Sequence, residues 1–192
     1  MPVYIGEWGT KNVREDWLDG HYVAMSEAAF RIGIEKNSDV VVMASFAPMF
    51  HREGYVKGVK APEGLADSNN FNGWPVTMIH FDGLRCFGRA SYHMQKLFAE
   101  NRPDVILGLK EGQPWSAHGS GAYSVCGYDR AAKELVLKVL NPAGAARPAE
   151  VTLPQAIPAT AARLIVFANE DEWADNTMDE PEKVVPKASV LD

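Results

Sequence analysis

The first fifth of the chain contains two short apolar runs separated by one long amphipathic stretch. Residues 3–5 are apolar and stop at Gly6, which predicts a short strand. Residues 22–36 carry apolar side chains at the spacing of a largely buried helix, and Asn37 is suited to end it in a left-handed conformation. Residues 40–44 are continuously apolar, which is typical of a parallel strand covered on both faces. This order predicts a right-handed βαβ crossover.

A stretch without a clear period follows, from Pro48 to Arg89. It is rich in Gly, Pro, Asn and aromatic residues, and a loop of this length is usually functional or disordered. The aromatic residues argue against disorder, and residues 76–81 suggest one short extended piece. Beyond the loop, Ser91 is a plausible N-cap of a second helix, which Arg102-Pro103 ends.

After Pro103 the pattern changes to short β-rich runs separated by Gly, Pro, Ala and Asp. Five strands are predicted, at residues 105–109, 123–128, 135–140, 150–153 and 163–167. Residues 128–134 read as a hairpin loop between two of them. Strands at this spacing favour an antiparallel sandwich.

The two patterns together predict a mixed α/β and all-β chain with a boundary near residues 101–104. One βαβ unit cannot bury a parallel sheet, because parallel strands need covered neighbours. We therefore expect residues 1–103 to be the last portion of a larger α/β domain. Residues 104–192 are expected to form a complete antiparallel β-sandwich.

Charge and hydropathy exclude two classes of partner. The chain has 19 basic and 25 acidic residues and a net charge of −6, and seven of the acids lie within residues 170–182. This acidic segment predicts a solvated, partly flexible tail, and the nearly neutral remainder makes nucleic acid a poor partner. No apolar run approaches the roughly 20 residues that cross a bilayer, so we expect no membrane span. The first residues lack the features of a signal peptide.

Cysteine and histidine do not predict a metal centre. Cys86 and Cys126 are 40 positions apart with no Cys-x-x-Cys, and we expect two buried free thiols rather than a disulfide. The five histidines are scattered, and none forms a His-x-x-x-His pair on one helix face. We therefore expect no metal and no cofactor.

One carboxylate lies at the end of a predicted strand, a position where catalytic groups are common. Glu7 lies just beyond the first predicted strand, between Gly6 and Trp8. In a parallel α/β barrel, catalytic groups lie at the C-terminal ends of strands. A carboxylate followed by an aromatic ring suits sugar chemistry, because the carboxylate can attack an oxocarbenium-like centre while the ring stacks on the sugar. On local sequence alone, an ordinary loop acid remains the alternative.

Long motifs in a fixed order make the sequence resemble the α-L-arabinofuranosidases of glycoside hydrolase family 51. These motifs lie at residues 4–8 (with Gly6-Glu7-Trp8), 24–41, 43–50, 79–82, 91–98 and 176–186. The resemblance implies that the chain holds the last βα units of a (β/α)8 TIM barrel followed by the sandwich domain. It also implies a retaining mechanism with two glutamates, a nucleophile and a general acid/base.

The resemblance also assigns site residues. Glu7 matches the nucleophile, whereas no Asn-Glu motif for the acid/base stands upstream of it. Trp8 stands where related sequences often have Tyr, a departure that can change the shape of the sugar pocket. Phe46 follows the second strand and Trp74 lies in the long loop, and both are candidate walls of that pocket, with ordinary packing as the alternative. Helix acids such as Glu27 are expected to be structural.

Two functions are compatible with this pattern. The first is part of an enzyme that releases terminal α-L-arabinofuranosyl groups from arabinan, arabinoxylan or their oligosaccharides, with the isolated chain inactive. The second is a non-catalytic β-sandwich that binds carbohydrate or supports the barrel. For the complete enzyme, an arabinose-containing saccharide is the expected partner, a homo-oligomer is possible, and an extracellular or periplasmic location is plausible.

Overall fold

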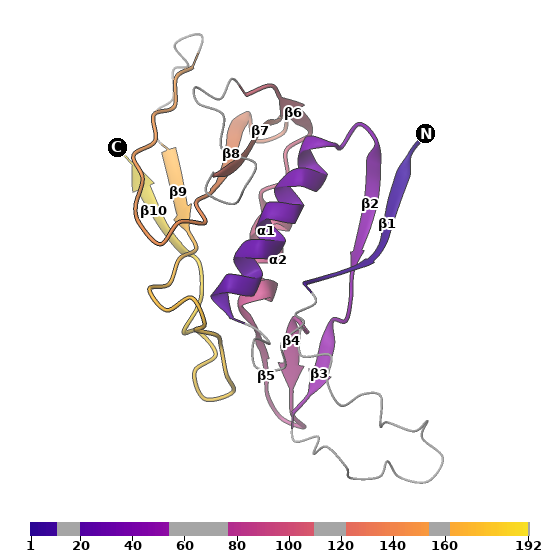
Figure 1. The fold of residues 1–192 in the computed structure, drawn as a ribbon, viewed down its shortest axis with the longest axis vertical. Coiled ribbons are helices and arrows are strands. Elements are labelled where there is room, and N and C mark those ends of the chain that lie inside the picture. The colour runs from indigo at the N-terminus through magenta and orange to yellow at the C-terminus, as the bar shows by residue number, and fades with distance from the viewer. Residues whose placement is uncertain (11–19, 54–76, 110–121, 154–161, 192) are drawn as a thin grey trace.

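The computed structural model describes residues 1–10, 20–53, 77–109, 122–153 and 162–191 (Figure 1). Two helices and ten strands lie in these ranges, and strands predominate. The helices are α1 (His21–Lys36) and α2 (Ala90–Glu100). The strands are β1 (Val3–Trp8), β2 (Val41–Phe46), β3 (Phe50–Arg52), β4 (Ile79–Phe81), β5 (Cys86–Gly88), β6 (Val105–Leu107), β7 (Tyr123–Asp129), β8 (Glu134–Leu140), β9 (Ala162–Val166) and β10 (Lys187–Leu191).

The predicted strand, helix, strand unit is confirmed. Strands β1 and β2 pair in parallel, from Val3 opposite Val41 to Trp8 opposite Phe46, and α1 connects them. The expected cover on both faces of the second strand is not observed, because Val42 is 65% exposed within the described chain. Figure 1 shows the helices on one side of this pair only, which agrees with the exposure of apolar side chains on both strands.

The end of α1 differs from the sequence prediction in its backbone. Asn37 has φ −107°, which is not left-handed. Its side-chain amide instead donates a 2.8 Å hydrogen bond to the carbonyl of Gly33. The side chain thus satisfies a carbonyl of the last turn directly, and the left-handed conformation is not needed.

The start of α2 is set by a residue far away in the sequence. The predicted cap Ser91 lies inside the helix and is buried, and Arg89 precedes the first helical residue. Asp175 Oδ1 accepts a 2.8 Å hydrogen bond from the Ala90 backbone N–H, and the same carboxylate pairs with the Arg89 guanidinium. A carboxylate at a helix N-terminus also interacts favourably with the helix dipole. The prediction that the acidic segment 170–182 is a solvated tail is therefore wrong at Asp175, in the middle of that segment.

The stretch expected to lack regular structure holds a small sheet. Strand β3 pairs in parallel with β4, and β4 pairs antiparallel with β5. The strands are three residues long each, which is too short for a periodic signal in the sequence. Of the predicted piece at residues 76–81, the last three residues form β4.

The second half pairs as two antiparallel sheets. One has the order β6–β7–β8 and the other joins β9 to β10. The predicted hairpin loop is confirmed, because the Asp129 side chain accepts hydrogen bonds from the backbones of Ala131 and Ala132, and Lys133 has a positive φ of 58°. Residues 150–153 are described but form no strand, contrary to the prediction. Strand β10 was not predicted.

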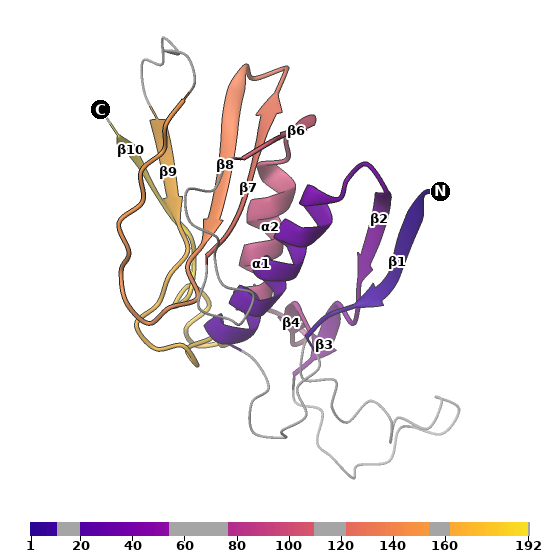
Figure 2. The same ribbon diagram turned by 45° about the horizontal axis from the view of Figure 1, so that its top comes forward.

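One hydrophobic core joins the two halves. Figures 1 and 2 show α1 and α2 side by side, with β7 and β8 on one side and β1 and β2 on the other. The buried core residues come from both sides of position 103, and they are Ala24, Ala28, Ile32, Ala90, Met94, Phe98, Val125, Leu140, Ala174 and Val184. Neither described helix is long and apolar enough to cross a membrane. Both cysteines are free as expected, but Cys86 is exposed and Cys126 is half-buried, so neither is the fully buried thiol that the sequence suggested.

Candidate active site

Glu7 lies inside strand β1, not beyond its end. It is exposed and sits one residue before the strand ends, opposite Ser45 of β2. The pairing shifts between Ile5 and Glu7, so Gly6 occupies an irregularity of the ladder rather than a strand stop. Such irregularities re-aim the side chains next to them and are common beside active sites. The carboxylate therefore lies at the C-terminal edge of a parallel pair.

Two of the predicted pocket residues contact each other at the end of this strand pair. Trp8 lies opposite Phe46, and their rings are 5.3 Å apart in an edge-to-face arrangement. The Trp8 ring also lies 5.0 Å from that of Phe30 on α1. Trp8 is thus fixed by aromatic contacts on two elements. The third predicted residue, Trp74, lies outside the described residues.

The chain after Glu7 passes close to the end of β2. A Cβ at Gly9 would lie 3.1 Å from the carbonyl of Ala47 and 3.4 Å from the Phe46 ring. The Ala47 N–H in turn donates a 3.0 Å hydrogen bond to the carbonyl of Trp8. The absence of a side chain at Gly9 therefore allows both strands to end at the same level.

Glu27 supports this rim from behind, a role for which the sequence shows no signal. Its side chain points from α1 toward the loop after β1, and Oε1 accepts a 3.3 Å hydrogen bond from the Thr10 backbone N–H. The residue is 1% exposed, and Oε2 has no partner among the described residues. Burial raises the pKa of Glu27 to about 7, while hydrogen bonds from Ser91 and Thr10 oppose this rise.

This burial predicts a pH-dependent stability that Glu27→Gln removes. Between pH 4.5 and 7 the folded state retains a proton that the unfolded state releases, so the free energy of unfolding falls as the pH rises through this window. We expect the neutral variant to gain about 2 kcal/mol relative to wild type at pH 8 and little at pH 4.5. Urea unfolding at both pH values checks this.

The exposed Glu100→Gln is the matched control: it keeps Glu27 and should show the same fall of stability with pH as wild type. A constant stability difference between Glu27→Gln and wild type across the window would contradict the expected titration of Glu27.

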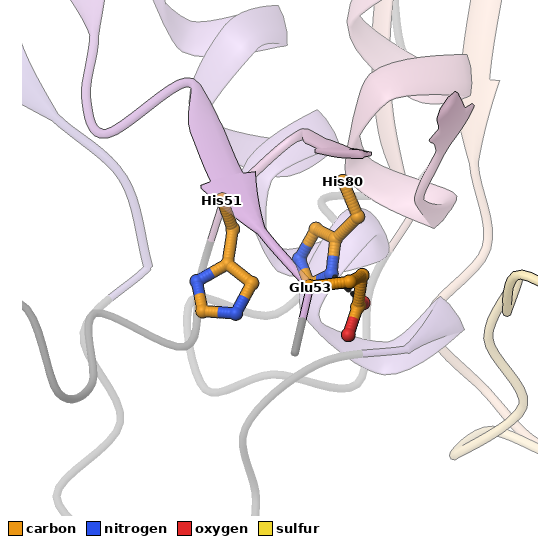
Figure 3. Close-up of side chains that lie close together, drawn as sticks. All are labelled: His51, Glu53 and His80. Atoms are coloured by element: carbon orange, nitrogen blue, oxygen red, sulfur yellow. Dashed lines mark hydrogen bonds and ion pairs between the residues drawn. The ribbon is translucent and has the colours of Figure 1, made fainter. Parts of the chain in front are cut away.

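A second polar cluster lies on the small sheet, where sequence reasoning expected none. His51 of β3, His80 of β4 and Glu53 direct side chains toward one another (Figure 3). His80 Nδ1 lies 2.7 Å from Glu53 Oε1, and its Nε2 lies 2.7 Å from Thr77 Oγ1. Burial lowers the pKa of His80, and nearby Arg89 lowers it further, although the bond to Glu53 raises it.

Comparison with known proteins decides the family. Residues 6–191 match the family model described as the α-L-arabinofuranosidase C-terminal domain. The chain belongs to this family. The match covers nearly the whole chain and confirms the resemblance to the family 51 enzymes.

Curated relatives of this arabinofuranosidase C-terminal domain are much longer than the chain. It is 27% identical over 175 residues to α-L-arabinofuranosidase 1 of Arabidopsis thaliana, covering 88% of the chain but 23% of that protein. It is 32% identical over 108 residues to an extracellular exo-α-L-arabinofuranosidase of Streptomyces chartreusis, covering 56% of the chain and 10% of that protein.

Solved structures share the fold. An arabinose-bound MgGH51 α-L-arabinofuranosidase superposes with a TM-score of 0.62 at 21% identity, over 90% of the chain and 24% of that protein. The GH51 arabinofuranosidase of Xanthomonas axonopodis pv. citri superposes with a TM-score of 0.64 at 16% identity, over 98% of the chain and 36% of that protein. The arabinofuranosidase C-terminal domain thus has the fold seen in one part of these enzymes.

Proposed function

We propose that the chain is the C-terminal part of a retaining α-L-arabinofuranosidase and that Glu7 is its nucleophile. The single observation that carries this proposal is the position of Glu7 at the C-terminal edge of a parallel strand pair. Parallel barrels place their catalytic groups at this edge. The family match supplies the chemistry that such a carboxylate would perform.

The proposed reaction proceeds in two displacements. The Glu7 carboxylate attacks the anomeric carbon of a terminal arabinofuranosyl group, and the bond to the leaving oxygen breaks as an acid/base glutamate protonates that oxygen. Water, deprotonated by the same glutamate, then hydrolyses the glycosyl ester. Trp8 and Phe46 would form part of the sugar-binding wall, and Trp74 remains a candidate for it.

We propose the same division of the chain as the sequence suggests. Residues 1–103 would be the last part of a (β/α)8 barrel, and residues 104–192 the β-sandwich. Exposed apolar side chains of β1 and β2 support further strands and layers against this pair. They are Val3, Tyr4, Val42 and Met43, each exposed by more than 40%.

The proposal predicts that the 192-residue chain does not hydrolyse an aryl α-L-arabinofuranoside. Retaining hydrolysis needs two carboxyl groups about 5 Å apart, and no Asn-Glu motif stands upstream of Glu7. Release of the coloured aryl alcohol measures turnover. A longer protein that contains this chain and an upstream Asn-Glu motif should be active, and turnover by the chain alone at the level of a complete relative would contradict the proposal.

A further inference from the structure

The register of the small sheet brings three metal-ligand side chains to one face. His51 and His80 are directly paired residues of the parallel strands β3 and β4. Glu53 follows His51 by two positions, and its backbone N–H donates a 2.7 Å hydrogen bond to the carbonyl of Phe81, which continues the ladder. Because strand side chains alternate between faces, His51 and Glu53 point the same way as His80 (Figure 3).

The distances between the ligand atoms are close to those of a coordination shell. One nitrogen of each imidazole and one oxygen of Glu53 all lie within 4.8 Å of one another. The two ring centroids are 4.7 Å apart. Metal–ligand bonds of about 2.0 to 2.2 Å place tetrahedral ligand atoms about 3.3 Å apart, so small rotations of the side chains would close the shell.

We propose that His51, Glu53 and His80 bind one Zn²⁺ ion. Two imidazoles and one carboxylate are a ligand set that Zn²⁺ accepts, with a fourth position left for water. The site is reachable from solvent, because the Glu53 side chain is 39% exposed, whereas His80 is 11% exposed and anchors it.

The surroundings of His80 are suited to coordination of the metal ion through its Nδ1 atom. Its Nε2 lies 2.7 Å from the buried Thr77 hydroxyl. An Nε2–H that donates to this hydroxyl leaves the Nδ1 lone pair free for the ion and holds the ring in place. Arg89 Nη1 also lies 3.3 Å from Nε2, but its guanidinium is paired with Asp175, which offsets the positive charge near the ion.

The same atoms also permit a metal-free arrangement. His80 Nδ1–H then donates to Glu53, and Nε2 accepts from Thr77 or Arg89. This arrangement makes no use of His51, whose ring only stacks on His80. The two alternatives therefore differ most clearly in what His51 contributes.

The position of the triad relates it to the rim that carries Glu7. Strand β3 begins four residues after β2 ends, and Figure 1 shows β3 and β4 beyond the C-terminal ends of β1 and β2. An ion here would fasten the chain after β2 to β4. Its binding rests on the triad alone and is independent of the proposed hydrolysis.

Isothermal titration of the full chain with Zn²⁺ tests the proposal. The chain is prepared without a polyhistidine tag and treated with a chelator beforehand. We expect saturable binding of one ion per chain and a rise in the melting temperature with Zn²⁺, because the ion binds the folded state. Co²⁺ should give visible d–d absorption at the same stoichiometry. Failure to saturate at one equivalent would overturn the proposal.

Variants separate the triad from adventitious binding. His51→Gln should abolish saturable Zn²⁺ binding while the chain stays folded, because His51 lies outside the His80–Glu53–Thr77 hydrogen bonds. Thr77→Val should weaken binding by about 10-fold to 100-fold. His93→Gln and Cys86→Ser are the matched controls and should bind as wild type does. Equal affinity in His51→Gln and the controls would overturn the proposal.

Discussion

On the proposed function, replacing Glu7 by Gln in a longer, active protein that contains this chain is expected to abolish hydrolysis. An amide cannot form the glycosyl ester, and loss of a nucleophile costs about four orders of magnitude or more in turnover. The fold should persist, because Glu7 is exposed at the end of β1. Aryl arabinofuranoside turnover, with circular dichroism as the folding check, measures both expectations.

Chemical rescue distinguishes a nucleophile from a structural acid. In Glu7→Gly, azide can occupy the space of the missing carboxylate and attack the anomeric carbon, which yields an arabinosyl azide of inverted configuration. The matched control is Glu100→Gln, which removes an exposed carboxylate from α2 and should retain full activity. Substantial turnover by Glu7→Gln, or no azide product from a folded Glu7→Gly, would remove Glu7 from the proposed role.

Lys138→Met is expected to destabilise the chain by about 3 kcal/mol, because it leaves a buried carboxylate without its partner. Lys138 Nζ lies 2.6 Å from Glu35 Oε1, and the two side chains are 12% and 10% exposed. The ammonium also lies 4.5 Å from the centre of the Phe98 ring. Burial lowers the pKa of Lys138, and the ion pair with Glu35 opposes this lowering.

Two further variants show that the effect comes from the unpaired charge. Lys138→Met combined with Glu35→Gln should recover part of the loss, because no unpaired carboxylate then remains, while Arg31 loses its interaction with the Glu35 charge. Lys96→Met breaks the exposed pair with Glu100 at 3.6 Å and should cost less than about 1 kcal/mol. Urea unfolding measures all three. Equal losses in Lys138→Met and Lys96→Met would show that the buried pair contributes no more than a surface pair.

The elements that the sequence predicted are those with a strong local pattern. The apolar spacing of residues 22–36 and the continuous run at residues 40–44 appear as α1 and β2 within one residue at each start. The hairpin of β7 and β8 was predicted from the loop at residues 128–134, where the structure shows Asp129 accepting a hydrogen bond from the Ala131 backbone. In these segments the conformation depends mainly on residues that are near in the sequence, so the spacing of apolar residues predicts it.

The candidate site was predicted in part for the same reason. Gly6-Glu7-Trp8 marks the end of a strand, and the parallel pairing of β1 with β2 brings Trp8 and Phe46 together as a strand, helix, strand unit requires. Glu27 was expected to be a structural helix acid, but its burial was not predicted. The residues next to an acid in an amphipathic helix do not indicate whether its side chain is exposed to solvent or buried against another element.

The amino-acid sequence by itself determined the family, the βαβ unit, the antiparallel strands of the second half and the candidate nucleophile Glu7. Tertiary structure alone decided which distant groups meet. Asp175 caps α2 and Lys138 of β8 pairs with Glu35 of α1. His51 faces His80, 29 positions later, because β3 and β4 align in register. The physical reason is that these contacts depend on packing and pairing between elements, which the local spacing of residues does not encode.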